Sequence, residues 1–353
     1  IGSQHTESET LLLIDDVRQL MAKIPIHGLC IFKNNHAEKE YPYLWRHGQK
    51  SVKDVNKYFL SPFSMDKRNH DATVLFDLNN GDTLVLPRSM ALAAACEVIF
   101  GNIWKSLGTK KAADLVGDVV EKCVARACRG GPHTLVEREI YTVKNENFEI
   151  DVGVRTDKEI VLFEMKAKTL TSKARSGDMF AFIDDYTKSY LHMAVQLFRH
   201  EYNIRSGFTS LATDDGNTMK VVKVAVSPLS FGPASDRAFA NALLRSVAFA
   251  RMHAVDGDKK TTEILEDFNE SVENIMNQIM AILPADAEEV NLHGAFFDLF
   301  WLDLGQLLYV LDRAGGVENA LNPMRHITFS TRDFWTEVFL IDKQGLTRKN
   351  GAT

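Results

Sequence analysis

The sequence predicts a mixed α/β fold, in which helices flank a β-sheet, together with a smaller α+β domain at the N-terminus. The chain has 353 residues, of which 45% are hydrophobic, so it can bury a sizeable core. Three runs with strand-like alternation follow one another between residues 133 and 168, and segments with helical spacing lie before and after them. An order of helix, three strands, long helix and strand is typical of a sheet packed between helices.

The first hundred residues predict an α+β domain of their own. Apolar residues recur with helical spacing over residues 8–23 and again over 89–107. The short strand-like segments of this part are HGLCIF, ATVLFDL and TLVL. The last two are joined by NNGD, a typical hairpin turn. We place the domain boundary near SLGTKK, which divides the chain into residues 1–105 and 106–353.

The second part shows a more regular alternation of elements. A helix over residues 110–128 ends at RGGP, a sequence that breaks helices. The elements expected after it are strands over 133–143, 145–155 and 160–168, a long helix over 178–204 and a β-branched strand over 219–229.

The C-terminal third predicts a helical insertion followed by further sheet elements. Residues from about 236 to 289 have helical spacing and many acidic side chains. The segment LHGAFFDLFWLDLGQLLYVLDRAGG then reads as a strand that continues into a helix, which the paired glycines end. HITFSTRDFWTEVF is expected to add one more β element.

The net charge, the cysteines and the apolar runs limit which partners and which cellular location we expect. The net charge of −6 argues against a uniformly basic nucleic-acid-binding surface, although it leaves room for a local basic cleft. The four cysteines form no CxxC pair, so we expect reduced thiols and a cytoplasmic protein. No apolar run reaches the length of a membrane span, so no membrane partner is expected. Because the chain begins without methionine, we expect a processed, tagged or truncated N-terminus.

The candidate site consists of charged residues in two otherwise apolar strands. Asp151 lies in the strand 145–155, and Glu164, Lys166 and Lys168 alternate along the next one. If these strands pair as a hairpin through the TDKE turn, Asp151 and Glu164 can converge on a divalent cation such as Mg²⁺. Lys166, beside them, would orient a water or stabilise charge on a phosphate.

This pattern resembles the PD-(D/E)XK, or restriction-endonuclease-like, nuclease superfamily. Asp151 is followed by twelve residues and then by Glu164 and Lys166 with one residue between them. The resemblance implies the restriction-endonuclease-like mixed sheet, with Asp151 and Glu164 as ligands of Mg²⁺ or Mn²⁺ and Lys166 as the catalytic lysine. It also implies that Glu121, on the preceding helix, is an additional acidic metal ligand. Gln196, on the following helix, would be a further catalytic residue.

The sequence departs from the family pattern at two places. Ile150 stands where the name of the family has proline, and Tyr202 follows Gln196 by six residues, whereas related branches place a tyrosine closely after the glutamine. The resemblance covers roughly residues 106–230, with residues 290–315 as a further candidate segment. It does not extend to the first hundred residues or to the acidic helical insertion.

The resemblance implies a metal-dependent nuclease, and DNA is the expected substrate. Lys168, Lys173 and Arg175 are the expected contacts to its backbone. A homo-oligomer or a defence-system protein is the expected partner, because such additional domains often occur in nucleases of anti-phage defence, restriction or repair. The alternatives are a catalytically inactive nuclease fold that binds nucleic acid or a protein, and an RNA-directed nuclease.

Simpler interpretations of the same residues stay open. The charges of the two strands could pair across a solvated hairpin, and Lys168 could be a solvated strand end. Glu121 and Gln196 could be ordinary polar positions of their helices, as could the neighbouring Lys188, Arg199 and His200. Other chemistries fit less well, because the sequence has no HExxH pair, no Walker GxxxxGK[ST] motif and no GxSxG elbow.

Overall fold

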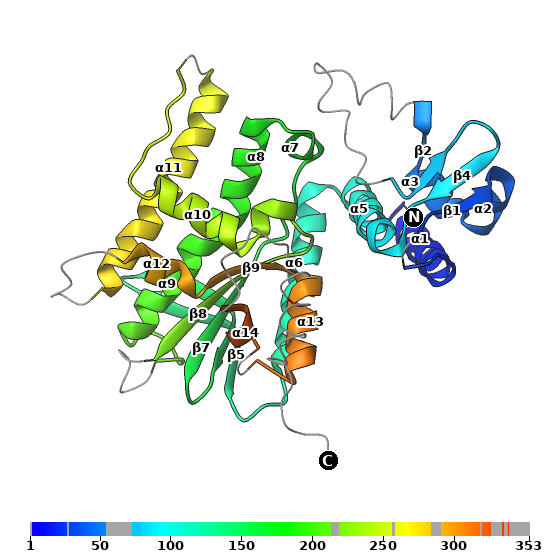
Figure 1. Cartoon of the computed structure of the whole chain (residues 1–353). Helices are drawn as coiled ribbons and strands as arrows, with labels where there is room; N and C mark the ends of the chain where they lie inside the picture. The colour runs from blue at the N-terminus through cyan, green and yellow to red at the C-terminus, as the bar shows by residue number, and fades with distance from the viewer. Residues whose placement is uncertain are drawn as a thin grey trace. The chain divides into compact units, whose positions relative to one another are not determined.

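The computed structural model of the protein comprises two compact units (Figure 1). One unit comprises residues 1–115 and 171–182, and the other comprises 116–170 and 183–353. The described residues are 2–26, 28–53, 73–212, 219–255, 258–283, 291–317, 320–325, 334 and 338. Helices α6 (Thr109–Cys128) and α8 (Met179–Tyr186) contribute residues to both units.

The first unit contains a four-stranded sheet with the order β1-β4-β3-β2. Its strands are β1 (Cys30–Lys33), β2 (Gln49–Ser51), β3 (Leu75–Asp77) and β4 (Asp82–Val85). Its helices are α1 (Gly2–Lys23), α2 (Asn34–Glu40), α3 (Pro42–Gly48), α5 (Arg88–Leu107) and α7 (Ser172–Arg175). The β3–β4 hairpin is antiparallel, as the NNGD turn predicts.

Helices α1 and α5 pack on each other and supply most of the core of this unit. Leu13 and Leu20 of α1 are fully buried, as are Val85 of β4 and Ala95 of α5. The heptad spacing of the two leucines places them on one side of α1, where burial of their apolar surface stabilises the packing. The apolar residues that recur along residues 8–23 therefore form the face of α1 that packs on α5.

The second unit contains a five-stranded sheet with the order β5-β6-β7-β8-β9. Its strands are β5 (Thr134–Val143), β6 (Glu146–Arg155), β7 (Glu159–Met165), β8 (Lys220–Ser227) and β9 (Leu299–Asp303). The first three strands are antiparallel neighbours, whereas β8 and β9 run parallel to β7. The result is a mixed sheet, as expected from the order of the elements.

Helices cover this sheet on both sides. The remaining helices of the unit are α9 (His192–Arg205), α10 (Arg237–Val247), α11 (Lys259–Ile282), α12 (Leu292–Phe297), α13 (Leu304–Ala314) and α14 (Asn322–Arg325). Helix α9 packs on β7 and β8, α11 packs on α9, and α13 lies on the other side of the sheet (Figure 1). All seven residues of β7 are buried, because this central strand has a neighbour on each edge and helices over both faces.

The expected long helix over 178–204 is divided by a π-helical turn. Helix α8 ends at Tyr186, the π-helical turn spans Thr187–Leu191, and α9 begins at His192. Thr187 donates a side-chain hydrogen bond to the carbonyl of Ile183, 2.8 Å away. A π-helical turn adds a residue to the helical repeat and therefore changes which side chains share a face on either side of it. The prediction of one uninterrupted α-helix is wrong in this respect.

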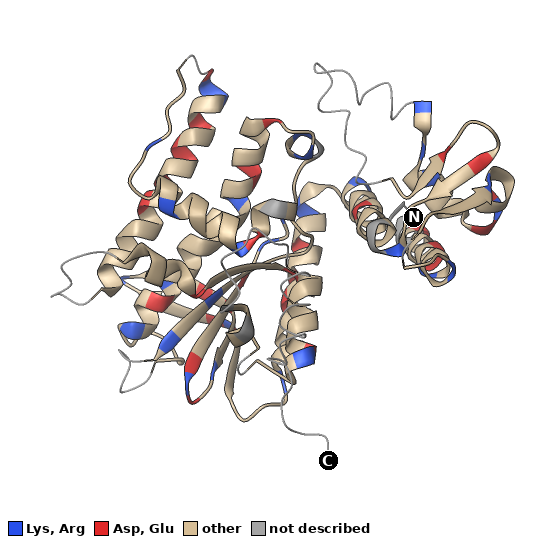
Figure 2. Cartoon of the chain, viewed as in Figure 1, with Lys and Arg blue, Asp and Glu red and all other residues tan. Residues whose placement is uncertain are grey.

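Most other predicted elements are confirmed, with differences at their ends. Strand β7 ends at Met165, so Lys168 lies after the strand and not within it. The acidic insertion forms two separate helices, α10 and α11, and acidic residues recur along α11 (Figure 2). The β element expected at HITFSTRDFWTEVF falls almost entirely outside the described residues. Within the described parts of the chain, no helix combines the length and the apolar character of a membrane span.

Candidate active site

Asp151 of β6 and Glu164 of β7 directly follow the last ladder pair of these two strands. The antiparallel ladder ends with Val152 paired to Phe163, and Asp151 and Glu164 are the next residues of their strands beyond that pair. The Asp151 carboxylate oxygen Oδ2 accepts a hydrogen bond from the backbone amide of Met165, 2.8 Å away. One of the two predicted metal ligands is therefore fixed to the strand that carries the other.

Both carboxyl groups are in surroundings that disfavour their charged forms. Burial, and then the neighbouring charge of Glu164, raise the pKa of Asp151 to about 7. Burial also raises the pKa of Glu164 to about 7, although the Lys166 ammonium opposes this shift. The Glu164 side chain is 1% exposed, and Lys166 Nζ lies 3.3 Å from its Oε1. Titratable groups with such displaced pKa values are concentrated at functional sites, so the pair is a candidate active site.

Lys166 connects the buried Glu164 to the surface. It follows β7 directly, and its backbone amide still donates to the carbonyl of Val226 on β8, 3.2 Å away. Its side chain is 34% exposed. The ammonium group can therefore contact Glu164 at one side and a solvent-borne ligand at the other.

Glu121 of α6 lies close enough to act on the pair but is held by Arg138. Its negative charge contributes to the raised pKa values of Asp151 and Glu164. Arg138 Nε donates to Glu121 Oε2 at 2.6 Å, and Nη2 donates to Asp118 Oδ1 at 2.9 Å. The arginine thus offsets part of the negative charge that α6 presents to the site.

Arg138 also interrupts the pairing of β5 with β6 next to the site. Glu137 pairs with Val152 and Glu139 with Ile150, but Arg138 itself makes no ladder pair with Asp151. Its backbone has φ 51°, in the left-handed region, which costs a non-glycine residue about 1–2 kcal/mol. Such conformations persist where the surroundings enforce them and are frequent at functional sites.

A chain of polar side chains reaches Glu164 from α9 and β5. Asn203 Nδ2 lies 2.9 Å from the Tyr141 hydroxyl, which lies 2.7 Å from His200 Nδ1. The other ring nitrogen of His200, Nε2, lies 3.7 Å from Glu164 Oε2. Both of these last atoms are buried and have no hydrogen-bond partner among the described residues. Burial lowers the pKa of His200 to about 4, so the ring is neutral at pH 7.

The residues present fit a divalent cation held by two carboxylates. Glu164 has an unpartnered buried oxygen, and a bound cation would favour the charged forms that burial disfavours. No cluster of three or more His, Cys, Asp or Glu side chains suited to a metal occurs among the described residues. The remaining ligands would therefore be waters or substrate oxygens, as is usual for Mg²⁺.

The other predicted site residues have separate surroundings. Gln196 is half-buried on α9. Lys168 Nζ lies 2.8 Å from the buried Asp185, and Lys173 Nζ lies 3.0 Å from Asp178. Arg175, which is 10% exposed, forms an ion pair with Glu97. Binding of a phosphate by any of these cations would require its ion pair to open, so their assignment to nucleic-acid binding stays a prediction.

Tyr141, Asn203 and Arg138 are site residues that the sequence analysis missed. It named His200 only as a possible ordinary polar position of its helix. A signal for His200 and Asn203 exists, because both are polar residues three positions apart, so they lie on one face of the helix, and both are buried there. No comparable signal identifies Arg138, whose unusual backbone angle depends on tertiary contacts.

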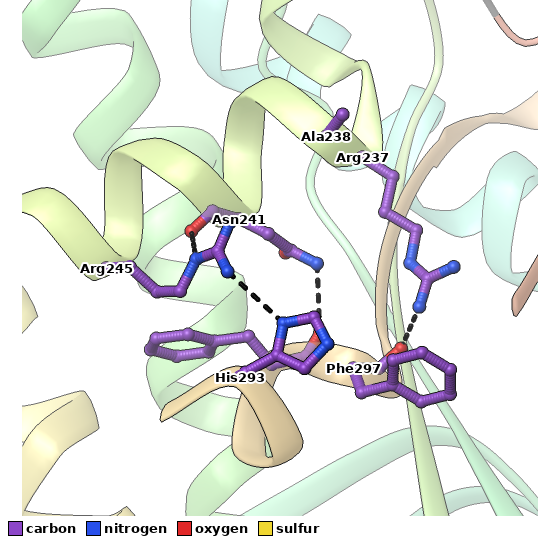
Figure 3. A pocket seen from close by; sticks show the side chains of 7 residues that line it. Arg237, Ala238, Asn241, Arg245, His293 and Phe297 are labelled. Carbon is purple, nitrogen blue, oxygen red and sulfur yellow. Dashed lines mark hydrogen bonds between the residues drawn. The ribbon is translucent and has the colours of Figure 1, made fainter. Parts of the chain in front are cut away.

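A separate pocket lies beside α10 and α12 (Figure 3). Arg237 donates to the carbonyls of Met324 and Phe297, and Asn241 Nδ2 donates to the carbonyl of Phe296 at 3.0 Å. Arg245 Nη1 lies 3.2 Å from His293 Nδ1. Carbonyls at the end of a helix lack partners within the helix, so the donors of Asn241 and Arg237 to Phe296 and Phe297 are explained as a cap of the end of α12.

Comparisons of this chain with models of protein families, with curated proteins and with solved structures gave no match.

Proposed function

We propose that the protein is a metal-dependent nuclease of the PD-(D/E)XK type that hydrolyses phosphodiester bonds of DNA. The observation that carries the proposal is that the half-buried Asp151 and the buried Glu164 lie on neighbouring antiparallel strands, with Lys166 in contact with Glu164. The order α6, β5, β6, β7, α9 and β8 supports it, because this is the succession of elements that the resemblance implies.

In this proposal Asp151 and Glu164 hold Mg²⁺ or Mn²⁺, and the Glu121 carboxylate adds negative charge nearby. When bound, the metal supplies a water of lowered pKa and polarises a phosphoryl oxygen. Lys166 holds the Oε1 side of Glu164 and presents its remaining N–H donors toward solvent, where they can orient the attacking water or stabilise charge on the phosphate. The hydrogen bond from the Met165 amide fixes the position of the Asp151 carboxylate.

Cleavage of nucleic acids by the purified protein with Mg²⁺ or Mn²⁺ tests the proposal. We expect DNA to be nicked or degraded, and Lys166→Ala to reduce the rate by at least about 100-fold because a charge-stabilising donor is lost. Lys259→Ala is the matched control, since this lysine is 91% exposed on α11. Circular dichroism of both variants shows whether the fold is retained.

Matched single- and double-stranded DNA and RNA substrates identify the nucleic acid. Cleavage of RNA alone would replace DNA by RNA in the proposal. A Lys166→Ala variant that cuts as fast as the parent would overturn the assignment of the site. Absence of both cleavage and Mn²⁺ binding would favour an inactive nuclease fold, with a role in anti-phage defence, restriction or repair limited to binding.

A further inference from the structure

We infer that Asn203, Tyr141 and His200 form a positioning relay that directs an N–H group of His200 at the Glu164 carboxylate and so fixes its orientation for binding a divalent metal. The inference rests on the proposed function, because it assigns Glu164 as a metal ligand. The three relay residues do not contact the substrate in this scheme. They act through Glu164.

The direction of the relay follows from counting protons. The Tyr141 hydroxyl has one proton, and its two partners in the described structure are Asn203 Nδ2 and His200 Nδ1. An amide NH₂ group can only donate, so the Tyr141 oxygen accepts from Asn203 and its own proton goes to His200 Nδ1. An imidazole whose Nδ1 accepts a hydrogen bond carries its ring proton on Nε2.

The Nε2–H group produced in this way faces one unpartnered atom. Glu164 Oε2 lies 3.7 Å from Nε2, and both atoms are buried without a partner among the described residues. Burying an unsatisfied donor and acceptor costs about 1–3 kcal/mol each, so a hydrogen bond between them is favoured. A relative movement of about 0.8 Å would bring the two atoms to the usual N–H···O separation.

The relay would act on a carboxylate that is already held at its other oxygen. Lys166 Nζ lies 3.3 Å from Glu164 Oε1, and His200 approaches Oε2. Two donors on different oxygens restrict rotation of the carboxylate about its last side-chain bond. Outer-shell hydrogen bonds of this kind orient metal ligands, and their loss typically costs 10–100-fold in metal affinity.

Tyr141→Phe is the most selective variant, because it removes one hydroxyl and keeps the ring. The ring of Tyr141 contacts Phe148 and His200 at centroid distances of 5.7 and 5.8 Å, and phenylalanine preserves both contacts. His200→Leu removes the donor, and His200→Gln restores an N–H donor at a similar reach. Tyr190→Phe is the control, since Tyr190 is fully buried in an aromatic stack with Trp301.

The first measurement is the tautomer of His200, read from ¹⁵N NMR of histidine-labelled protein without metal. We expect the proton on Nε2 in the parent and in Tyr190→Phe, and loss of this preference in Tyr141→Phe. A proton on Nδ1 in the parent would mean that Asn203 presents its oxygen to Tyr141, and it would overturn the relay. This readout does not depend on catalysis or on a bound metal.

The second measurement is Mn²⁺ affinity by isothermal titration calorimetry. We expect a Kd about 10–100-fold weaker in Tyr141→Phe and His200→Leu, partial recovery in His200→Gln, and no change in Tyr190→Phe. Unchanged affinity in the first two variants, with binding still abolished by Asp151→Asn, would overturn the relay and leave the proposed function intact. Parent protein that binds no Mn²⁺ would overturn the metal site itself, and with it the role assigned to the relay.

Discussion

The Asp151 carboxylate accepts a hydrogen bond from the Met165 amide at 2.8 Å, one step beyond the last ladder pair of β6 and β7. A side chain here continues the cross-strand connection that the backbone no longer makes. Asp151 therefore has a structural role in joining the two strands as well as its proposed role as a metal ligand. Substitutions of Asp151 will therefore affect both the connection of the two strands and the binding of a metal.

The metal-free protein is predicted to lose stability as the pH rises from 5 to 8. Asp151 and Glu164 both have a folded-state pKa of about 7, above the ordinary values of 3.8 and 4.5. A raised carboxyl pKa means that the contribution of the group is fully present below its unfolded pKa and is lost as the pH rises through 7. We expect a loss on the order of 2 kcal/mol per carboxyl by urea unfolding.

Replacing a carboxyl group of this pair by its neutral amide should reduce the dependence of the unfolding free energy on pH. Glu164→Gln is expected to be more stable than the parent at pH 8, because a buried negative charge is removed. Glu263→Gln is the control, since Glu263 is 61% exposed on α11. A parent protein with equal unfolding free energies at pH 5 and 8 would contradict the prediction.

Neutralising Arg138 is predicted to strengthen metal binding. Arg138 holds Glu121 through a 2.6 Å hydrogen bond, and Arg138→Gln would remove a positive charge and release this carboxylate toward Asp151 and Glu164. We expect the Kd for Mn²⁺ to fall by up to about tenfold, by calorimetry. Arg129→Gln, which breaks an exposed pair with Glu137, is the control. Weaker or unchanged Mn²⁺ binding in Arg138→Gln would argue that Glu121 plays no part in binding the metal.

Lys223 is predicted to be essential to the stability of the second unit. Its Nζ lies 2.5 Å from Glu201 on α9, and both side chains are at least 92% buried. Burial alone would raise the pKa of Glu201, but the Lys223 and Arg205 charges hold that pKa below its ordinary value. Lys223→Met should cost about 3–5 kcal/mol of unfolding free energy, because it leaves a buried carboxylate without one of its two partners.

The corresponding change at an exposed pair provides the comparison. Lys220 is 39% exposed and pairs with Asp298 at 3.0 Å. Lys220→Met should cost less than about 1 kcal/mol. Equal losses of unfolding free energy in Lys220→Met and Lys223→Met would show that the burial of the Lys223–Glu201 pair is unimportant.

Two glycine-to-alanine substitutions are predicted to change the unfolding free energy in opposite directions. A Cβ at Gly153 of β6 would lie 2.6 Å from a Leu211 methyl carbon and 2.8 Å from one of Val136, so Gly153→Ala should destabilise by about 1–3 kcal/mol. A Cβ at Gly117, inside α6, meets no atom within 4 Å, and alanine there should stabilise by about 0.5–1 kcal/mol. Denaturant midpoints measure both, and a stabilised Gly153→Ala would contradict the packing argument.

The sheet of the second unit was predictable because each strand has a clear local pattern. Alternation in β5 and β6 and the β-branched run of β8 identify strands without knowledge of their neighbours, and the TDKE turn sets the β6–β7 register. The convergence of Asp151 and Glu164 follows from that register. Short elements such as α2, α3 and β2 were missed because three to seven residues carry too little periodicity.

The surroundings of the carboxylate pair were not predictable in the same way. Tyr141 and His200 are 59 positions apart and meet only after α9 has packed on the sheet. The left-handed backbone of Arg138 has no local sequence cue, since glycine or asparagine is usual there. Local patterns therefore located the carboxylates, whereas the residues that surround them depend on tertiary packing.

The π-helical turn at Thr187–Leu191 has a consequence for recognising relatives of this chain. Because one α-helical residue turns by about 100°, a single extra residue puts α8 and α9 out of phase with each other. An alignment that forbids gaps inside this helix would match His200 to the wrong position in a relative that has an ordinary α-helix. A search for related sequences should therefore permit a one-residue insertion between Tyr186 and His192.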